Sequence, residues 1–112
     1  MICDFGDVTV VPFPSTDLDL SKSRPALVLS SGAFHAAIGQ TIVAMVTTAS
    51  RSDWPSDIVL ADNQAAGLLH PSRVRLKLFT LPNELITRRI GGLGAADRKA
   101  VRTAVRHHLP LK

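Results

Sequence analysis

The sequence predicts a mainly β fold, a small barrel followed by a C-terminal α-helix. Three observations support this fold class. The 112 residues are enough to bury one hydrophobic core, so we expect a single domain over residues 1–112. As far as residue 93, short segments rich in β-branched residues are separated by turn-forming residues. After that point the apolar residues recur with a helical period.

The predicted strands are short segments that differ in how their apolar residues are arranged. We expect them at residues 6–13, 25–30, 41–48, 57–60, 73–81 and 85–93. The first and third are apolar at nearly every position, which predicts burial of both their faces. The fifth, RVRLKLFTL, alternates, which predicts two different faces. One face carries Val74, Leu76, Leu78 and Thr80, and the other carries Arg75, Lys77 and Phe79.

The predicted helix begins after Gly94, a residue that can serve as its N-cap. Asp97, three residues later, complements the helix dipole and can reach back to the cap. An apolar stripe should pack on the barrel, and a basic stripe should face solvent, with a nucleic-acid contact as the alternative. The apolar stripe is Leu93, Ala100, Val101, Ala104, Val105 and Leu109, and the basic stripe is Arg98, Arg102 and Arg106.

Composition and charge indicate a globular protein with an anionic partner. Hydrophobic residues make up 46% of the chain and charged residues 20%, which excludes a disordered tail. Thirteen Lys and Arg against nine Asp and Glu give a formal net charge of +4, which favours a partner such as nucleic acid. The single cysteine cannot form an internal disulfide, and no signal peptide or membrane span is expected. These features predict a cytoplasmic protein.

Two loops are unusual in their length or content. Residues 14–23 separate the first two strands with ten mostly polar residues, more than a hairpin needs. Residues 49–56 follow the third strand and carry the only tryptophan, Trp54, close to Arg51. Such a pair can stack on a nucleobase. Alternatively, Trp54 caps the end of the barrel, and the sequence leaves both interpretations open.

Familiar catalytic motifs are mostly absent from the sequence. There is no Gly-rich phosphate loop, no HExxH motif and no cysteine pair with metal-binding spacing, so nucleotide hydrolases and zinc enzymes have no support. His107 and His108 are adjacent, and a helix would point them in different directions. His35 and His70 lie in or beside predicted turns, and we interpret both as structural. Cys3 has no basic neighbour in the sequence and is interpreted as inert.

Arg24 stands directly before Pro25 and the apolar run of residues 26–29. A guanidinium at the mouth of a buried strand cannot lose its charge, so it requires a partner. An acid of the preceding loop, Asp17 or Asp19, is one candidate. An anionic ligand is the other, and the residues alone do not decide between them.

The order of motifs along nearly the whole chain resembles the MazF/PemK family of toxin endoribonucleases. The motifs are GDVTVVPFP, SRPALVLS, VTTAS, GLLHPSRVRLKLFTL and RRIGGLGAADRKAVRTAV. The resemblance implies one toxin domain with an SH3-like barrel and a C-terminal helix. It implies a homodimer that cuts single-stranded RNA without a metal or cofactor, and that a cognate antitoxin inhibits.

The resemblance also implies roles for individual residues. The family's catalytic arginine precedes the proline that opens the second strand, which is Arg24 here, and its catalytic threonine ends the third strand, which is Thr47. As a planar fork, Arg24 would stabilise the charge that develops on a phosphate attacked by a ribose 2′-hydroxyl. We further expect RNA contacts from Lys22, Thr48, Arg51, Trp54, Arg75 and Lys77.

One departure from the family concerns the general base. In much of the family an acid lies in the strand that here reads RVRLKLFTL, where this chain has Arg75 and Lys77 instead. The sequence therefore does not identify the group that removes the 2′ proton. The alternative function is a non-catalytic barrel that binds RNA or a protein partner, since a related toxin family of similar fold poisons gyrase without cutting nucleic acid. The Arg24 and Thr47 pair favours the nuclease, and the missing acid favours the binding module.

Overall fold

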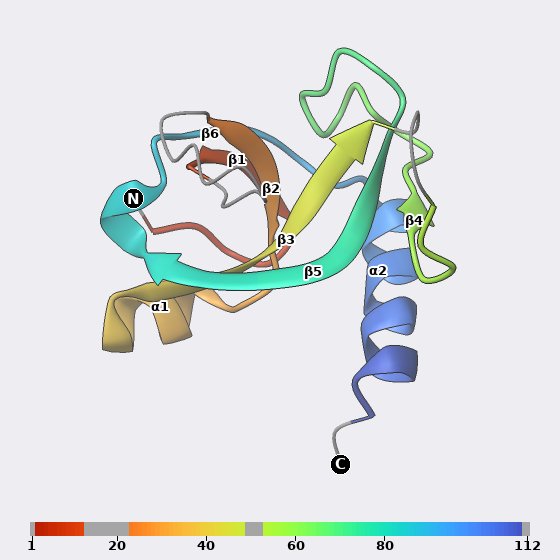
Figure 1. Cartoon of the computed structure of the whole chain (residues 1–112). Coiled ribbons are helices and arrows are strands. Elements are labelled where there is room, and N and C mark those ends of the chain that lie inside the picture. Colours follow the sequence, from red (N-terminus) through yellow and green to blue (C-terminus); the bar gives the residue numbers. More distant parts are fainter. Residues whose placement is uncertain (1, 13–22, 49–52, 111–112) are drawn as a thin grey trace.

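One antiparallel sheet forms the framework of the protein (Figure 1). The computed structural model describes residues 2–12, 23–48 and 53–110, and within them six strands follow the order β4-β5-β3-β2-β1-β6. The strands are β1 (Asp7–Val11), β2 (Arg24–Val28), β3 (Gln40–Thr48), β4 (Ile58–Val59), β5 (Ser72–Pro82) and β6 (Arg88–Gly92). The helices are α1 (Gly32–Ile38), the short 3-10 helix η1 (Asn83–Leu85) and α2 (Ala95–His108).

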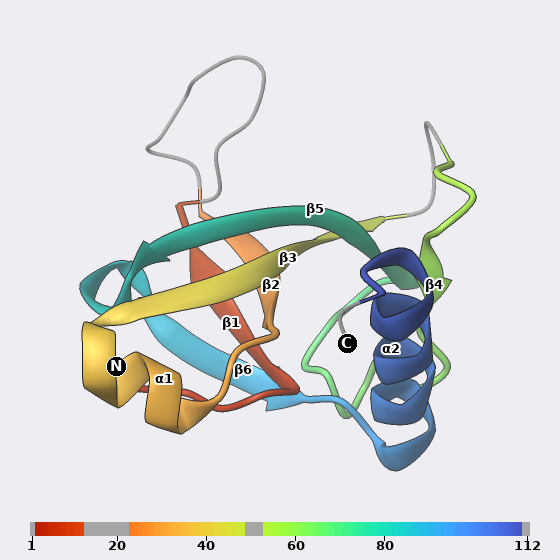
Figure 2. The same ribbon diagram turned by 90° about the horizontal axis from the view of Figure 1, so that it is seen from below.

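The sheet curls into a half-barrel, with α2 beside β4 at one end and α1 at the opposite end (Figures 1 and 2). This confirms the predicted fold class of a mainly β protein with a C-terminal helix. No helix in the described ranges combines the length and the apolar character that a membrane span requires.

The pairing of β3 with β5 is interrupted by a bulge. Ala44 pairs with Leu78 and Met45 with Arg75, so Leu76 and Lys77 are extra residues on β5. Because two residues are inserted and not one, side chains on either side of the bulge still alternate between the same two faces of the sheet. The residues of β5 therefore lie on the faces predicted for them. Burial does not alternate beyond the bulge, because residues 78–80 are all exposed.

Hydrophobic residues are buried on both faces of the sheet. Adjacent residues of β1, Val8 and Thr9, are fully buried, as are Val43 and Ala44 of β3. This confirms the prediction that the first and third strands bury both faces. One cluster includes Leu27, Ala44, Val46, Val74 and Val101, and the other includes Val11, Ala26, Val28, Val43 and Leu81. The first cluster lies between the sheet and α2, and Cys3 belongs to the second.

The helix α1 was not predicted from the sequence. The Ser31 side chain caps it by accepting the N–H of Phe34, and Gly39 ends it in the left-handed conformation, with φ of 72°. His35 anchors the helix: Nδ1 donates to the Cys3 carbonyl at 2.6 Å, and Nε2 lies 2.5 Å from the Ser30 hydroxyl. The fully buried His35 is thus structural, as predicted, although it lies in a helix and not beside a turn.

The helix α2 begins after Gly94, as predicted, but two of its side chains act differently. Asp97 is buried and accepts the N–H groups of Ala61 and Asp62, both at 2.9 Å, instead of reaching back to the cap. Arg98 is half-buried and donates to the carbonyls of Leu93 and Phe5, so it is not a freely solvated side chain. The apolar stripe is also narrower than predicted, because its members Ala100 and Leu109 are exposed.

Candidate functional site

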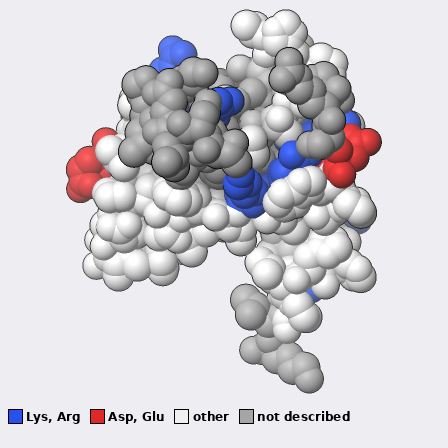
Figure 3. All heavy atoms as spheres, viewed as in Figure 1, with Lys and Arg blue, Asp and Glu red and all other residues white. Residues whose placement is uncertain are grey.

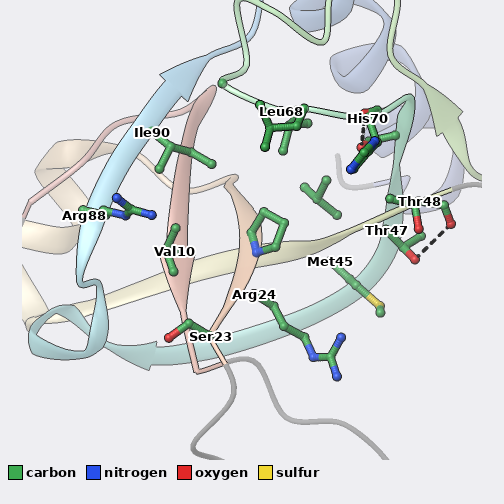
Figure 4. A pocket seen from close by; sticks show the side chains of 15 residues that line it. Val10, Ser23, Arg24, Met45, Thr47, Thr48, Leu68, His70, Arg88 and Ile90 are labelled. Atoms are coloured by element: carbon green, nitrogen blue, oxygen red, sulfur yellow. Dashed lines mark hydrogen bonds between the residues drawn. The ribbon is translucent and has the colours of Figure 1, made fainter.

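A pocket of about 460 Å³ opens where the start of β2 lies beside the end of β3 (Figure 4). The antiparallel register pairs Ala26 with Met45, which brings Arg24 to the level of Thr47. Arg24, Thr47 and Thr48 all line the pocket. The structure therefore places both residues predicted as catalytic, and the neighbouring hydroxyl, on one site.

Arg24 is the first residue of β2, and one of its hydrogen-bond donors, Nε, is left without an acceptor in the described part of the protein. This Nε atom is buried. Among the described residues no carboxylate forms an ion pair with Arg24. The two acids considered from the sequence, Asp17 and Asp19, lie outside the described residues. A buried, unsatisfied donor on a charged group is costly, and a bound anion would satisfy it.

The sheet aligns several cations with Arg24. Paired residues point to the same face of a sheet and successive residues point to opposite faces. Met45 pairs with Arg75 and Thr47 with Arg73, so the face that carries Arg24 also carries these side chains. Figure 3 shows Lys and Arg side chains in the hollow centre of one face of the molecule, with Asp and Glu at its margins. Among the described residues, carboxylates form ion pairs with Arg73 and Arg75 and none with Arg24, so the uncompensated positive charge lies at Arg24, in the pocket.

Among these cations, Arg75 is bound by both a carboxylate and an aromatic ring. It is 8% exposed and makes two hydrogen bonds to Asp57, Nε to Oδ1 at 3.1 Å and Nη2 to Oδ2 at 2.9 Å. The Trp54 ring covers the guanidinium, with 5.0 Å between Cζ and the ring centroid. The hydrogen bond from Arg75 lowers the pKa of Asp57, which keeps this carboxylate ionised. Asp57 is therefore engaged with arginines, and Arg73 contacts it as well, at 3.5 Å.

The remaining predicted RNA contacts fall in three places. Trp54 is 41% exposed and lies over Arg75, so it has an accessible ring and is not a buried cap. Lys77 lies in the bulge of β5 and is partly buried. Thr48 is exposed at the end of β3, and its carbonyl accepts a hydrogen bond from the Thr47 hydroxyl at 3.3 Å. Lys22 and Arg51 lie outside the described residues.

Sequence reasoning missed other polar residues of the pocket. His70, which we had interpreted as structural, is exposed and lines the pocket, as do Ser72 and Arg88. No local sequence pattern indicates Arg88, because this residue reaches the site only through the pairing of β6 with β1, in which Arg88 lies opposite Val10. His70 lies two residues before the first residue of β5, and the pairing of Ser72 with Thr48 brings it beside the end of β3.

One protein-family model matches nearly the whole chain. Residues 4–109 match the family model of the PemK-like, MazF-like toxin of type II toxin–antitoxin systems. No curated protein sequence matches the chain.

Solved structures share the fold at low sequence identity. The MazE–MazF complex (Form-II) from Deinococcus radiodurans is 19% identical with a TM-score of 0.74, covering 100% of this chain and 99% of that one. An endoribonuclease in complex with its cognate antitoxin from a mycobacterial species is 18% identical with a TM-score of 0.75, covering 99% and 96%. The Mycobacterium tuberculosis toxin MazF-mt6 is 22% identical with a TM-score of 0.73, covering 95% and 98%. Such similarities establish a common fold.

Proposed function

Because the chain belongs to the PemK-like, MazF-like toxin family of type II toxin–antitoxin systems, we propose that it is an endoribonuclease that cuts single-stranded RNA without a metal ion. The observation that carries the proposal is Arg24, which lines one pocket with Thr47 and whose buried Nε has no hydrogen-bond partner in the part of the chain that the structure describes. An endoribonuclease similar to the chain in fold, at 18% identity, supports the reaction class.

The proposed reaction is attack by a ribose 2′-hydroxyl on its own phosphate. The bond between O2′ and phosphorus forms as the bond to O5′ breaks, which leaves a 2′,3′-cyclic phosphate and a free 5′-hydroxyl. The 2′ proton passes to water, and O5′ takes a proton from water. Arg24 stabilises the negative charge that develops on the non-bridging oxygens, and the Thr47 hydroxyl donates one further hydrogen bond.

The cationic face next to the pocket is proposed to hold the RNA backbone. Arg73, Arg75 and Lys77 lie along β5, and the exposed Trp54 ring offers a surface for base stacking. A cognate antitoxin with an acidic, flexible segment would compete for the same charges, so its binding should weaken as ionic strength rises. We propose that the protein works as a homodimer.

The test is a panel of labelled single-stranded RNAs incubated with wild type and Arg24→Lys, with and without EDTA. We expect wild type to cut in EDTA, to release 2′,3′-cyclic phosphate ends and to stop when a deoxynucleotide replaces the ribose 5′ of the cut. Arg24→Lys should cut about 10²–10³-fold more slowly, because a point charge does not reproduce a bidentate fork. The matched control is Arg106→Lys on the exposed side of α2, which should cut as wild type does.

Two results would refute the mechanism. Cleavage that requires magnesium would mean that a cation, and not Arg24, supplies the positive charge. An Arg24→Lys protein as fast as wild type would remove Arg24 from the reaction. If a folded wild-type protein bound RNA or an antitoxin but cut no RNA, the non-catalytic binding module would replace the nuclease. Arg75 and Lys77 favour this alternative, because they lie in the strand where much of the family has an acid.

A further inference from the structure

We propose that the inner half of the pocket at the β2–β3 strand ends binds one nucleobase of the RNA, next to the phosphate that Arg24 contacts. This inference rests on the proposed function, since it assigns the substrate group that the second half of the same pocket accepts. The base-binding half, as we name it, consists of Val10, Pro25, Val46, Thr48, Leu68, His70, Arg88 and Ile90.

The pocket has two chemically different halves because it is lined by residues of β2 and β3 that point to opposite faces of the sheet. Arg24 and Thr47 point to one face of the sheet, so their neighbours Pro25 and Thr48 point to the other. Figure 4 shows Leu68 and His70 on the side of the strands away from the Arg24 guanidinium. A ligand that fills the pocket therefore meets a cation and a hydroxyl at one edge and a separate surface behind it.

That second surface is apolar and flanked by polar groups. Val10 pairs with both Pro25 and Arg88, so these three side chains share a face, and Leu68 and Ile90 cover it. The Thr48 hydroxyl and the His70 ring form no hydrogen bond with another described residue, which leaves both for a ligand. Ser72 is already engaged, since its hydroxyl donates to the His70 carbonyl at 2.8 Å.

A nucleotide of single-stranded RNA carries the chemical groups that match the two halves of the pocket. Its base is planar and largely apolar, with hydrogen-bonding groups at the edge, and its phosphate is anionic. No carboxylate of the described residues lines the pocket, whereas Arg24 and Arg88 do, so the site favours an anionic ligand. The volume of about 460 Å³ lies within the range of about 300–1,000 Å³ typical of small-ligand sites, which suits one nucleotide unit.

The loop that covers the base-binding half is fixed in advance of binding. Leu68 N–H donates to the Asn63 carbonyl at 2.9 Å, and Ser72 N–H donates to the Asn63 side chain at 3.0 Å. The buried Asp97 holds the start of the loop through the N–H groups of Ala61 and Asp62. A rigid site loses little conformational entropy when it binds a ligand.

The direct test uses trinucleotides that carry 2′-deoxyribose, which the proposed reaction cannot cut. Four of them differ only in the central base, and a fifth has an abasic centre. Backbone amide resonances of Thr48, Leu68 and His70 should shift further with at least one base-containing trinucleotide than with the abasic one, which still offers its phosphates to Arg24 and Thr47. Equal shifts with the abasic trinucleotide, or no shift of these amides with any trinucleotide, would overturn the proposal.

Two variants test the same site by filling it or removing its polar edge. Leu68→Trp should weaken binding of the preferred trinucleotide about 10-fold or more by occupying the base position, and the matched control Leu109→Trp at the end of α2 should not. His70→Ala, at an exposed position that the fold tolerates, should reduce the discrimination among the four bases. Unchanged discrimination and affinity in both folded variants would contradict the assignment.

Sequencing the cut ends of a randomised RNA pool separates this inference from the proposed function. If wild type cuts RNA, His70→Ala should relax the base preference at one position beside the cut. Cutting without any such change would refute the base-binding half alone. Base-dependent amide shifts in a protein that cuts no RNA would refute the endoribonuclease and retain the base-binding half.

Discussion

At the scale of single residues, the partners of an arginine decide what it can do. Arg98 donates to two backbone carbonyls, and Arg75 holds the carboxylate of Asp57, so both stabilise the fold. Arg24 too is placed by a strand, but its buried Nε has no hydrogen-bond partner within residues 2–12, 23–48 and 53–110. The sequence predicts that Arg24 needs a partner, but pattern alone could not show which groups would be within its reach.

The Asp57–Arg75 ion pair should make the stability of the protein depend on pH. The folded-state pKa of Asp57 is lowered, chiefly by the hydrogen bond from Arg75. The resulting stabilisation is therefore present above the unfolded carboxyl pKa of about 3.9 and is lost as pH falls through the lower folded-state value. Asp57→Asn should reduce the unfolding free energy at pH 7 by on the order of 3 kcal/mol, because it removes the carboxylate that accepts two hydrogen bonds from a buried guanidinium.

Urea unfolding of wild type and Asp57→Asn between pH 7 and pH 3 measures this effect. The difference between the two proteins should be largest near neutral pH and should shrink below about pH 4. Asp53→Asn is a suitable control, since the Asp53 side chain is 76% exposed and its ion pair with Arg73 should contribute little. A difference that stays constant over the whole pH range would show that the carboxylate charge is not what stabilises the fold.

At the scale of elements, two glycines let the pocket loop lie against β6. A Cβ atom at Gly91 would lie 2.4 Å from the Ala66 carbonyl carbon, and one at Gly67, where φ is 74°, would lie 2.1 Å from the Ile90 oxygen. These contacts involve backbone atoms that no rotamer change can move. The loop therefore sits on β6 only because these positions carry no side chain.

Gly91→Ala should destabilise the protein by about 1–3 kcal/mol, because the loop must move away from β6. Thermal unfolding gives the stability, and amide shifts of Leu68 and His70 report the displaced loop. Gly32→Ala is the matched control, since its Cβ would come no closer than 3.4 Å to any neighbour, and the protein should tolerate it. Normal stability together with unchanged loop resonances in Gly91→Ala would contradict the close contact.

Element prediction succeeded where the local pattern is strong and failed where distant contacts decide. Segments rich in β-branched residues predicted all six strands approximately, and the change to a helical period predicted α2. The short α1 has little apolar periodicity and depends on the burial of His35 against the Cys3 carbonyl, a contact across the chain. Likewise, the bulge at Leu76 and Lys77 follows from the pairing with β3 and leaves no signature in an alternating sequence.

At the scale of the whole molecule, exposed apolar side chains lead us to predict a homodimer. Leu78 on β5 is 38% exposed, and Leu85 on η1 is 43% exposed. Apolar surface of this kind is commonly buried between subunits. Light scattering at micromolar concentration should give the mass of two chains, and Leu78→Asp should shift the protein toward the monomer, whereas Leu109→Asp should not. A wild-type protein that is monomeric throughout would refute the prediction.

The candidate site shows the same limit of sequence reasoning at a larger scale. The sequence identifies Arg24 and Thr47 as candidates because each lies in a short motif that the chain shares with the MazF/PemK family. His70 and Arg88 join them only through the curl of the sheet, which brings the segment before β5 and the strand β6 to the pocket. Side chains that meet through tertiary structure have no fixed spacing in the sequence, so no pattern could have grouped them.

The pairing of β1 with β6 has a consequence for synthesis of the chain on the ribosome. Asp7 pairs with Gly92, so the first strand to be made waits for the last before its second edge is covered. Ribosomes add about 5–20 residues per second, so the nascent chain spends seconds with that edge unpaired. A message truncated before codon 88 yields a chain without the Arg88 and Ile90 side of the pocket and without the strand that covers the second edge of β1. Translation must therefore reach the last strand before any copy of the protein can assemble its site.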